Sequence, residues 1–154
     1  MVLRNADVFK LWQRDKPETL VKTYDLDFEL SKLASIVKNT AALEDIRSIF
    51  IANYDYIKDV FLTLTINSGT FPYLGLQDFA RFVKEIGLMD SEVVTNSRIT
   101  FITASVKAKP KQLDFNVIKG QPGNELNRAE FIEVLVRLAI TKYGEKTVNT
   151  SDCV

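Results

Sequence analysis

The 154-residue sequence predicts an all-α fold of six to eight helices. Its composition favours helices with aromatic packing, because phenylalanine is abundant at ten copies while glycine (six) and proline (four) are scarce. The strongest helical pattern covers residues 126–143, where apolar side chains recur at helical spacing and form one stripe. A related pattern covers residues 74–88, so the sequence has the features of a divergent duplicated unit.

The helix expected within residues 126–143 has signals at both ends. Asn127 is suited to be the N-cap, and Glu130 three residues later completes a capping-box pattern. Lys142 falls in the last turn, where the helix dipole favours a cation. Gly144 follows directly, and glycine commonly ends a helix in the left-handed conformation. We expect this helix to be the organising element of the fold.

The two related stretches align over most of their length. Each has an apolar residue, three intervening residues, an acidic residue, and then a phenylalanine that opens an amphipathic helix. The aligned pairs are Leu74 with Leu126, Asp78 with Glu130, Phe79 with Phe131, Val83 with Leu135 and Ile86 with Leu138. Two unrelated amphipathic helices can share the last three aligned positions by chance. They are less expected to share the first three aligned positions as well.

The first part of the chain is expected to supply further helices. A short helix capped by Asn5 ends near Lys16, because the residue before a proline avoids the helical region, and Pro17 then opens the next turn. Either Asp25 or Asp27 is the expected cap of the second helix, Thr40 that of the third, and Asn53 or Asp55 that of the fourth. The expected helices cover residues 5–15, about 26–38, about 41–52 and about 55–64.

The remaining segments alternate helices with polar connections. A turn-rich stretch follows residue 64, and the helix of the first related unit is closed by Gly87. Another helix is expected at about 92–107, followed by a connection of unusual length. Within it, residues 113–118 form either a short strand or an ordered loop. Residues 146–154 are polar and are expected to be a flexible tail.

The overall totals exclude several functional classes. Twenty basic and twenty acidic residues cancel, so no net field indicates a nucleic acid or an anionic membrane as partner. The sequence has no histidine, which removes histidine-based catalysis and histidine-ligated metals. Its single cysteine, Cys153, allows neither an internal disulfide nor a thiolate zinc site. We therefore expect no catalytic residues and no cofactor, although a Ser–Lys arrangement is not excluded by sequence.

Two further features bear on location. The sequence has no apolar run near the roughly twenty residues that a membrane span needs. Its N-terminus lacks a continuous apolar core and a cleavage site, so we expect no signal peptide. Low cysteine usage suits a reducing compartment. The sequence-based expectation is a cytoplasmic protein.

The repeated order of helix, loop, apolar residue, acid and phenylalanine resembles the EF-hand superfamily over about residues 55–143. In that family the eighth loop position is apolar and pairs with the partner loop as a short strand, the last loop position is an acid, and an aromatic residue follows. The matching residues are Leu74, Asp78 and Phe79 in the first unit and Leu126, Glu130 and Phe131 in the second. The resemblance implies that Leu74 and Leu126 lie close together and that Phe79, Phe82, Phe131 and Leu135 belong to the core.

Both loops depart from the calcium-binding pattern of the family. The first, from about Thr65 to Asp78, is roughly two residues longer than the usual twelve, and the second, from about Lys107 to Glu130, is roughly twice that length. Calcium needs six to eight oxygen ligands, several of them carboxylates. Asp78 is the single acid of the first loop, and the acids of the second are widely spread among lysines. We expect no metal site, and Asp78 and Glu130 are the weak candidates if calcium binds.

Degenerate pairs of this kind resemble modules of protist and ciliary cytoskeletal proteins, where the fold is kept as a scaffold. We therefore expect a single helical domain over residues 1–145, with N-terminal helices at 5–52 and an EF-hand-like pair at 55–143. The N-terminal helices are expected to pack across the groove that an open EF-hand pair offers to a target helix. Whether they fill this groove, and the oligomeric state, are open at this point.

Three functions remain as alternatives. The first is a non-catalytic protein-interaction or scaffold module, cytoskeletal or ciliary, with a protein partner and no response to calcium. The second is a calcium-regulated sensor with atypical loops. The third is an enzyme or small-ligand carrier that uses an apolar cavity between helices, which requires a buried pocket with convergent polar groups.

Two other features are candidate sites. Trp12, together with Phe9, is a candidate anchor for a protein partner, because tryptophan is favoured at binding hot spots; packing onto the core is the alternative. The acidic cluster of the second helical region is interpreted as a solvated helix N-terminus rather than a metal or paired-carboxylate site. Its members are Glu18, Asp25, Asp27 and Glu29.

Overall fold

The computed structural model describes residues 17–89, 95–107 and 125–144. Helices make up most of this described part, which confirms the all-α class. The elements in chain order are α2 (Pro17–Ser31), α3 (Leu33–Ile36), α4 (Thr40–Ser68), β1 (Leu74–Gly75), α5 (Leu76–Glu85), α6 (Asn96–Lys107), β2 (Glu125–Leu126) and α7 (Arg128–Tyr143). The helix expected at 5–15, the segment at 113–118 and the tail lie outside the described residues.

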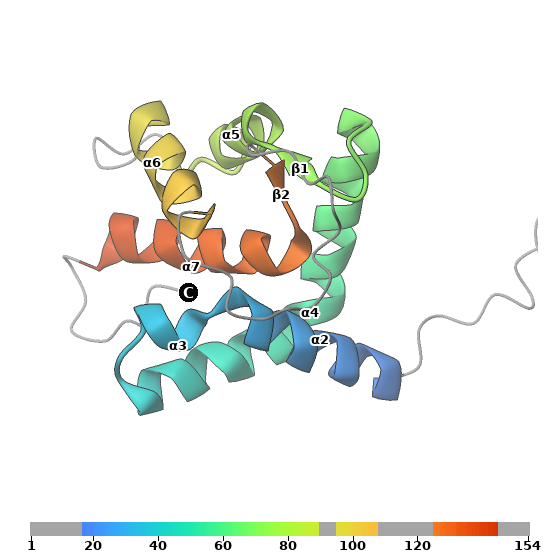
Figure 1. Cartoon of the computed structure of the whole chain (residues 1–154), viewed down its shortest axis with the longest axis vertical. Helices are drawn as coiled ribbons and strands as arrows, with labels where there is room; N and C mark the ends of the chain where they lie inside the picture. Colours follow the sequence, from blue (N-terminus) through green and yellow to red (C-terminus); the bar gives the residue numbers. More distant parts are fainter. Residues whose placement is uncertain (1–16, 90–94, 108–124, 145–154) are drawn as a thin grey trace, which may run out of the picture.

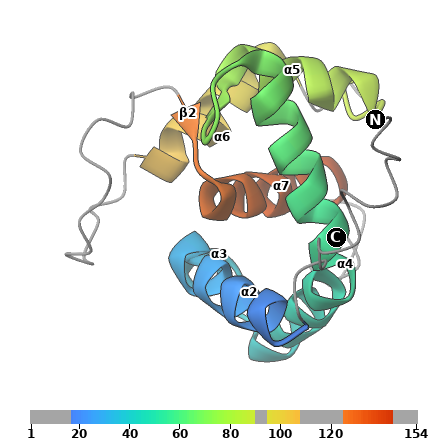
Figure 2. The same ribbon diagram turned by 90° about the vertical axis from the view of Figure 1, so that its right-hand side faces the viewer.

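Helix α7 runs across the middle of the molecule (Figure 1). One side of it is covered by α5, α6 and the two short strands, and the other side by α2, α3 and the first half of α4 (Figures 1 and 2). Helix α4 is long enough to run along both sides. No described helix has the length and apolar character that crossing a membrane requires.

Two hydrophobic clusters meet at α7. Phe131, Val134 and Leu138 of α7 belong to the first cluster, whereas Ile132 and Val136 belong to the second. The first cluster also contains Phe61, Leu74, Phe79, Val83, Ile99, Ile102, Val106 and Leu126. The second also contains Tyr24, Leu33, Val37, Ala42, Ile46, Phe50 and Tyr54. Burial on both sides makes α7 a central helix, rather than the one-stripe amphipathic helix that its sequence predicts.

The two related units contact each other through their loops. Strands β1 and β2 pair antiparallel, with Leu74 opposite Leu126 and both side chains fully buried. This confirms the expected juxtaposition of these two leucines. The ring centroids of Phe79 and Phe131 lie 6.2 Å apart in an edge-to-face arrangement, and Phe82 lies 6.1 Å from Phe131. Phe79 and Phe131 are buried core residues, as predicted, while Phe82 and Leu135 are partly buried and pack against them.

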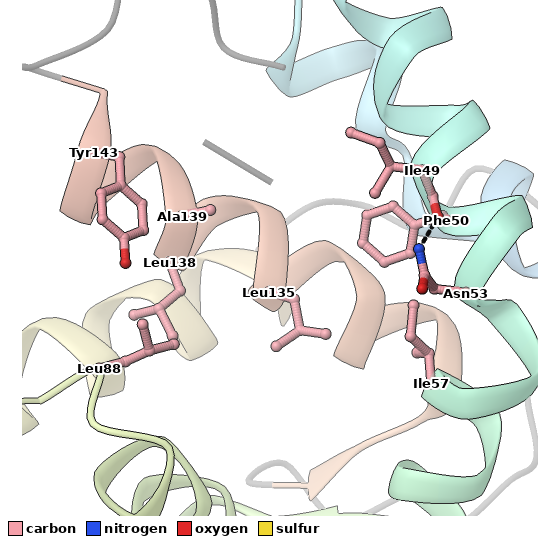
Figure 3. A pocket seen from close by; sticks show the side chains of 9 residues that line it. All are labelled: Ile49, Phe50, Asn53, Ile57, Leu88, Leu135, Leu138, Ala139 and Tyr143. Atoms are coloured by element: carbon pink, nitrogen blue, oxygen red, sulfur yellow. Dashed lines mark hydrogen bonds between the residues drawn. The ribbon is translucent and has the colours of Figure 1, made fainter. Parts of the chain in front are cut away.

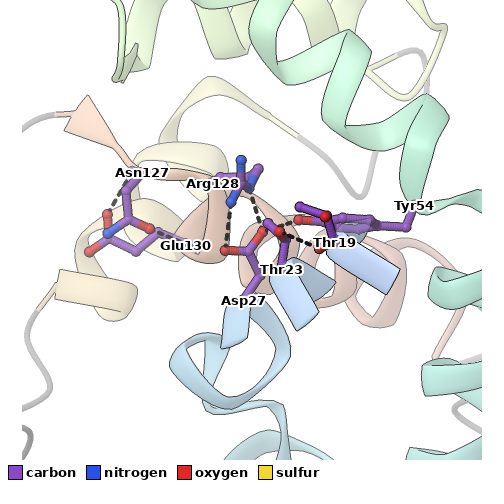
Figure 4. Close-up of polar contacts among 7 residues, drawn as sticks. All are labelled: Thr19, Thr23, Asp27, Tyr54, Asn127, Arg128 and Glu130. Carbon is purple, nitrogen blue, oxygen red and sulfur yellow. Dashed lines mark hydrogen bonds and ion pairs between the residues drawn. The ribbon is translucent and has the colours of Figure 1, made fainter. Parts of the chain in front are cut away.

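The cap expected at the start of α7 is present. The side-chain oxygen of Asn127 accepts the backbone N–H of Glu130 at 2.9 Å, and the Glu130 carboxylate accepts the backbone N–H of Asn127 at 3.0 Å (Figure 4). The prediction for the other end is wrong, because Gly144 is right-handed at φ −62° and ψ −24°. Its N–H donates to the carbonyl of Ile140 at 2.8 Å, so the helical hydrogen-bond pattern continues through it.

The related helix α5 does end in a left-handed glycine. Gly87 has φ 71°, and its N–H donates to the carbonyl of Lys84 at 3.0 Å. The N–H of Leu88 donates to the carbonyl of Val83 at 3.1 Å, which completes the double hydrogen bond of a Schellman motif. The expected closure at Gly87 is therefore confirmed, and it fixes the direction in which Leu88 leaves the helix.

Helix α4 is continuous, although the sequence predicts two helices with a break at residues 53–55. Asn53 does not cap a new helix, because its amide donates to the carbonyl of Ile49 at 2.8 Å within the same helix. The N-cap is Asn39 rather than Thr40, and its side chain accepts the N–H groups of Ala41 and Ala42. One long helix can therefore bury side chains in both clusters.

The predicted bounds of the preceding helix are also wrong. A helix is expected at about 26–38, but α2 spans Pro17–Ser31, and a left-handed residue, Lys32 at φ 56°, separates it from α3. The start at Pro17 agrees with the expected role of this proline. The two acids considered as caps lie inside the helix, where Asp25 pairs with Arg47 of α4 at 3.0 Å. These carboxylates therefore hold neighbouring elements instead of starting a helix.

Asp27 is the centre of a buried polar contact between three helices (Figure 4). Its side chain is 6% exposed. The hydroxyl of Tyr54 on α4 donates to it at 2.6 Å, and Arg128 on α7 donates through Nε and Nη2, the second at 3.2 Å. Burial, together with the hydrogen bond to Asp27, raises the pKa of Tyr54 above its ordinary value, which keeps the phenol protonated as a donor. Because the carboxylate of Asp27 is buried, the interpretation of this residue as part of a solvated helix N-terminus is wrong.

Replacing Arg128 tests how much the fold depends on this contact. Arg128→Met leaves the carboxylate of Asp27 buried without its cation, so we expect the free energy of unfolding to fall by about 3–5 kcal/mol. The same change at the exposed ion pair of α5, Arg81→Met, is expected to cost less than about 1 kcal/mol. Urea unfolding followed by circular dichroism measures both values.

A second substitution separates charge from packing. Adding Asp27→Asn to Arg128→Met removes the unpaired charge while keeping an acceptor for Tyr54, so part of the lost stability should return. Equal losses for Arg128→Met and Arg81→Met would contradict a structural role for the buried contact.

Candidate functional site

Asp78 and Glu130, the weak candidates for calcium, occupy equivalent places in the structure. Each is the third residue of the helix that follows its strand, α5 for Asp78 and α7 for Glu130. Their carboxylates have protein partners. Asp78 pairs with Arg81 at 3.5 Å, and Glu130 accepts the N–H of Asn127 and is 8% exposed. In both units the acid thus acts at the start of a helix, where the helix dipole favours negative charge.

Among the residues that the structure describes, these acids are not gathered into a larger ligand cluster. Across residues 17–89, 95–107 and 125–144, no group of three or more His, Cys, Asp and Glu side chains is placed to hold a metal ion. The basic loop that follows Lys107, the anchor candidates Phe9 and Trp12, and Cys153 all lie outside the described residues.

One surface depression of the described chain is an apolar groove between α4 and α7 (Figure 3). Its volume is about 360 Å³. We call it the α4–α7 groove, and its lining residues are Ile49, Phe50, Asn53 and Ile57 from α4, Leu88 from the end of α5, and Leu135, Leu138, Ala139 and Tyr143 from α7. Such a volume accommodates a few apolar side chains of a bound segment.

Helical spacing explains why these side chains share one surface. On α4, Ile49, Asn53 and Ile57 are four residues apart, which places them one above another on one face. The floor is well packed, because Phe50 is 3% and Leu138 is 1% exposed. The edges are more open, with Ile49 at 37% and Tyr143 at 38%. The groove therefore combines a rigid apolar base with accessible apolar edges.

The end of α5 is held against α7 at this site. The Schellman motif directs Leu88 into the groove lining, and the ammonium of Lys142 donates to the carbonyl of Gly87 at 3.3 Å. The same ammonium lies 5.5 Å from the ring centroid of Tyr143. Leu88 forms the third wall of the groove, and the left-handed turn at Gly87 places it there.

The groove offers few polar groups to a ligand. Asn53 and Tyr143 are the two lining residues with polar side chains, and the amide of Asn53 is already engaged with the carbonyl of Ile49 (Figure 3). Catalytic and small-molecule sites place several polar groups around one point. The chemistry of this lining instead suits contact with an apolar surface.

The N-terminal helices do not cover this groove. Helices α2 and α3 belong, with Ile132 and Val136 of α7, to the second cluster, and no residue of either helix lines the groove. The predicted packing of the helices within residues 5–52 across the target groove of an EF-hand pair stays a prediction, and residues 1–16 lie outside the described part. The contact of Asp27 with Arg128 holds α2 against the first turn of α7.

A second depression lies between α3, α6 and α7 and has a volume of about 290 Å³. Its residues are Ile36, Arg98, Phe101, Ile102, Arg137, Ile140 and Thr141. The guanidinium of Arg137 is held by the buried carboxylate of Glu133 at 2.8 Å. This depression is more polar than the α4–α7 groove, and its charged groups are engaged within the protein, so it is the weaker candidate.

Sequence reasoning missed the groove residues of α4. Ile49 and Phe50 were assigned to one helix and Ile57 to the next, so their common face could not be recognised. The repeat of apolar or amide residues at 49, 53 and 57 was the available signal. It is a weak one, because asparagine at the central position also starts helices.

Comparisons with known proteins give no further guide to this site. No family model matches the chain, and no match is found among curated proteins or among solved structures.

Proposed function

We propose that this chain is a non-catalytic protein-interaction module of the scaffold kind, with an EF-hand-like pair that works without calcium. The observation that carries the proposal is the α4–α7 groove, whose lining is apolar and whose floor is rigid. A groove of this character suits the apolar face of an amphipathic helix from a partner protein, which is anchored at positions i, i+3, i+4 and i+7.

The EF-hand-like part of the proposal is supported by the relation between the two units. Leu74 and Leu126 pair between loops, and an acid followed by phenylalanine opens the helix after each loop. Both acids are used inside the protein, by Arg81 and by the cap at Asn127. The frame of the pair thus serves to pack the core, which fits a scaffold; the cytoskeletal or ciliary setting is proposed from the sequence resemblance alone.

Binding at the groove can be tested with a defined probe. The probe is a synthetic amphipathic peptide without tryptophan, with leucine at i, i+3, i+4 and i+7 and lysine and glutamine elsewhere. In amide NMR spectra we expect its titration to shift the signals of groove residues such as Asn53, Ala139 and Tyr143. Ile49→Lys places a charge at the groove edge and should weaken binding at least about tenfold, since an unpaired charge against an apolar surface costs more than about 1.4 kcal/mol.

The matched control is on the same helix. Ile51→Lys makes the same chemical change two residues away, at a position 49% exposed that does not line the groove. It should leave the affinity unchanged. Shifts that spread over unrelated surfaces, or equal losses for both lysine variants, would count against a binding function at the groove.

Calcium independence is tested separately. We expect calorimetric titration with calcium to give no heat of binding and the melting temperature to be unchanged, because Asp78 and Glu130 are engaged with protein donors and belong to no larger acid cluster within the described part of the chain. Binding in the micromolar range that is lost in Asp78→Asn or Glu130→Gln would favour the calcium-sensor alternative instead.

A further inference from the structure

The α4 wall of the α4–α7 groove is bordered by an acidic row of residues, which we call the α4 rim. Asp45, Ala52 and Asp59 follow one another at intervals of seven residues, close to two helical turns, so they lie in one row along α4. Tyr56 falls beside this row, and all four residues are exposed. Ile49, seven residues before Tyr56, is the exposed edge of the groove lining. The α4 rim therefore runs alongside the groove.

The two cations of α4 lie on the other side of the helix. Helical spacing places Arg47 and Lys58 roughly opposite Ile49. Arg47 pairs with Asp25 of α2 at 3.0 Å, and Lys58 pairs with Asp55 at 3.4 Å. The four residues of the α4 rim include two carboxylates and neither of these cations. This edge of the groove is therefore negatively charged.

The other walls of the groove also favour a cation over an anion. They are formed by the last turns of α7 and by Leu88 just after α5, and the C-terminal end of a helix has a negative pole of about half an elementary charge. Lys142, in the last turn of α7, donates to the carbonyl of Gly87 at 3.3 Å, so its charge is offset by these two helix ends. Lys84 and Glu85 in the last turn of α5 are opposite in charge.

The spacing of these features determines the length of a matching partner. The α4 wall of the groove, from Ile49 to Ile57, is about 12 Å long at a rise of about 1.5 Å per residue (Figure 3). Asp45 and Asp59 lie beyond the two ends of this wall and are about 21 Å apart on the same measure. An apolar stripe of two helical turns therefore fits between two cations that face the α4 rim.

We infer that the partner of the α4–α7 groove is an amphipathic helix that lies along α4 and has a basic residue at each end of a two-turn apolar stripe. The stripe contacts Phe50 and Leu138 in the groove, the basic residues face Asp45 and Asp59, and the ring of Tyr56 is open to one of them. Complementary charge of this kind selects between partners. The inference rests on the proposed function and names the chemistry of the partner.

Two synthetic peptides test this chemistry. Both have leucine at i, i+3, i+4 and i+7 and glutamine elsewhere, except at i−3 and i+11, which lie on one flank of the stripe and match the spacing of the two acids of the α4 rim. These two positions are lysine in the basic peptide and glutamate in the acidic peptide. In amide NMR titrations at low ionic strength, the basic peptide should bind at least about fivefold more tightly, because attraction at two exposed positions replaces repulsion. Salt at about 0.5 M should reduce this preference.

A double charge reversal on the protein tests the place of contact. Asp45→Lys/Asp59→Lys makes the α4 rim basic, so the acidic peptide should become the tighter ligand. The matched control, Glu18→Lys/Glu29→Lys, makes the same change of net charge at two exposed positions of α2, which does not line the groove. The control should keep the preference for the basic peptide. Far-UV circular dichroism and thermal melting confirm that both variants are folded.

The outcomes separate this inference from the proposed function. Equal affinities for the two peptides, both weakened by Ile49→Lys, support binding at the groove and reject the basic partner. A preference for the basic peptide that persists in Asp45→Lys/Asp59→Lys also rejects this inference, because the basic residues then bind elsewhere. Failure of both peptides to bind rejects the proposed function itself.

Discussion

A single buried carboxylate determines how the helices are assembled. Asp27 binds Tyr54 of α4 and Arg128 of α7, so three elements separated by up to 101 residues are fixed at one point. A charge with 6% exposure is tolerated only when it is paired and hydrogen-bonded, which makes this geometry strict. It holds α2 against the first turn of α7, on the side of α7 that α5 and α6 do not cover (Figure 1).

The fold gives the two sides of α7 different roles. On one side, Ile132 and Val136 are closed off by α2 and α3. On the other, Phe131 and its neighbours join the two related units through the short pairing of Leu74 with Leu126. The groove remains where the second cluster ends, between the middle of α4 and the last turns of α7. A partner that binds in the groove therefore leaves the packing between the two related helix-loop-helix units intact.

Local signals in the sequence were sufficient for some of this structure and insufficient for the rest. The capping box at Asn127, the turn at Gly87 and the meeting of the two leucines were predictable, because each depends on residues near in sequence or on the repeat. The burial of Asp27 was not, since its cation comes from Arg128 and an acid in a helix is usually solvated. The groove was missed for a related reason. Asparagine often starts a helix, so the sequence predicts a break at Asn53, whereas tertiary packing keeps α4 helical at this position.

The continuity of α4 has a consequence for long-range communication. Asn53 and Tyr54 are adjacent in one turn, and they face the groove and Asp27 respectively. When this turn of α4 moves as a rigid body, both side chains move with it. Any occupant that favours a displaced position of this turn must therefore change how tightly α2 is attached, and by thermodynamic reciprocity a looser α2 must change the affinity of the occupant by the same factor.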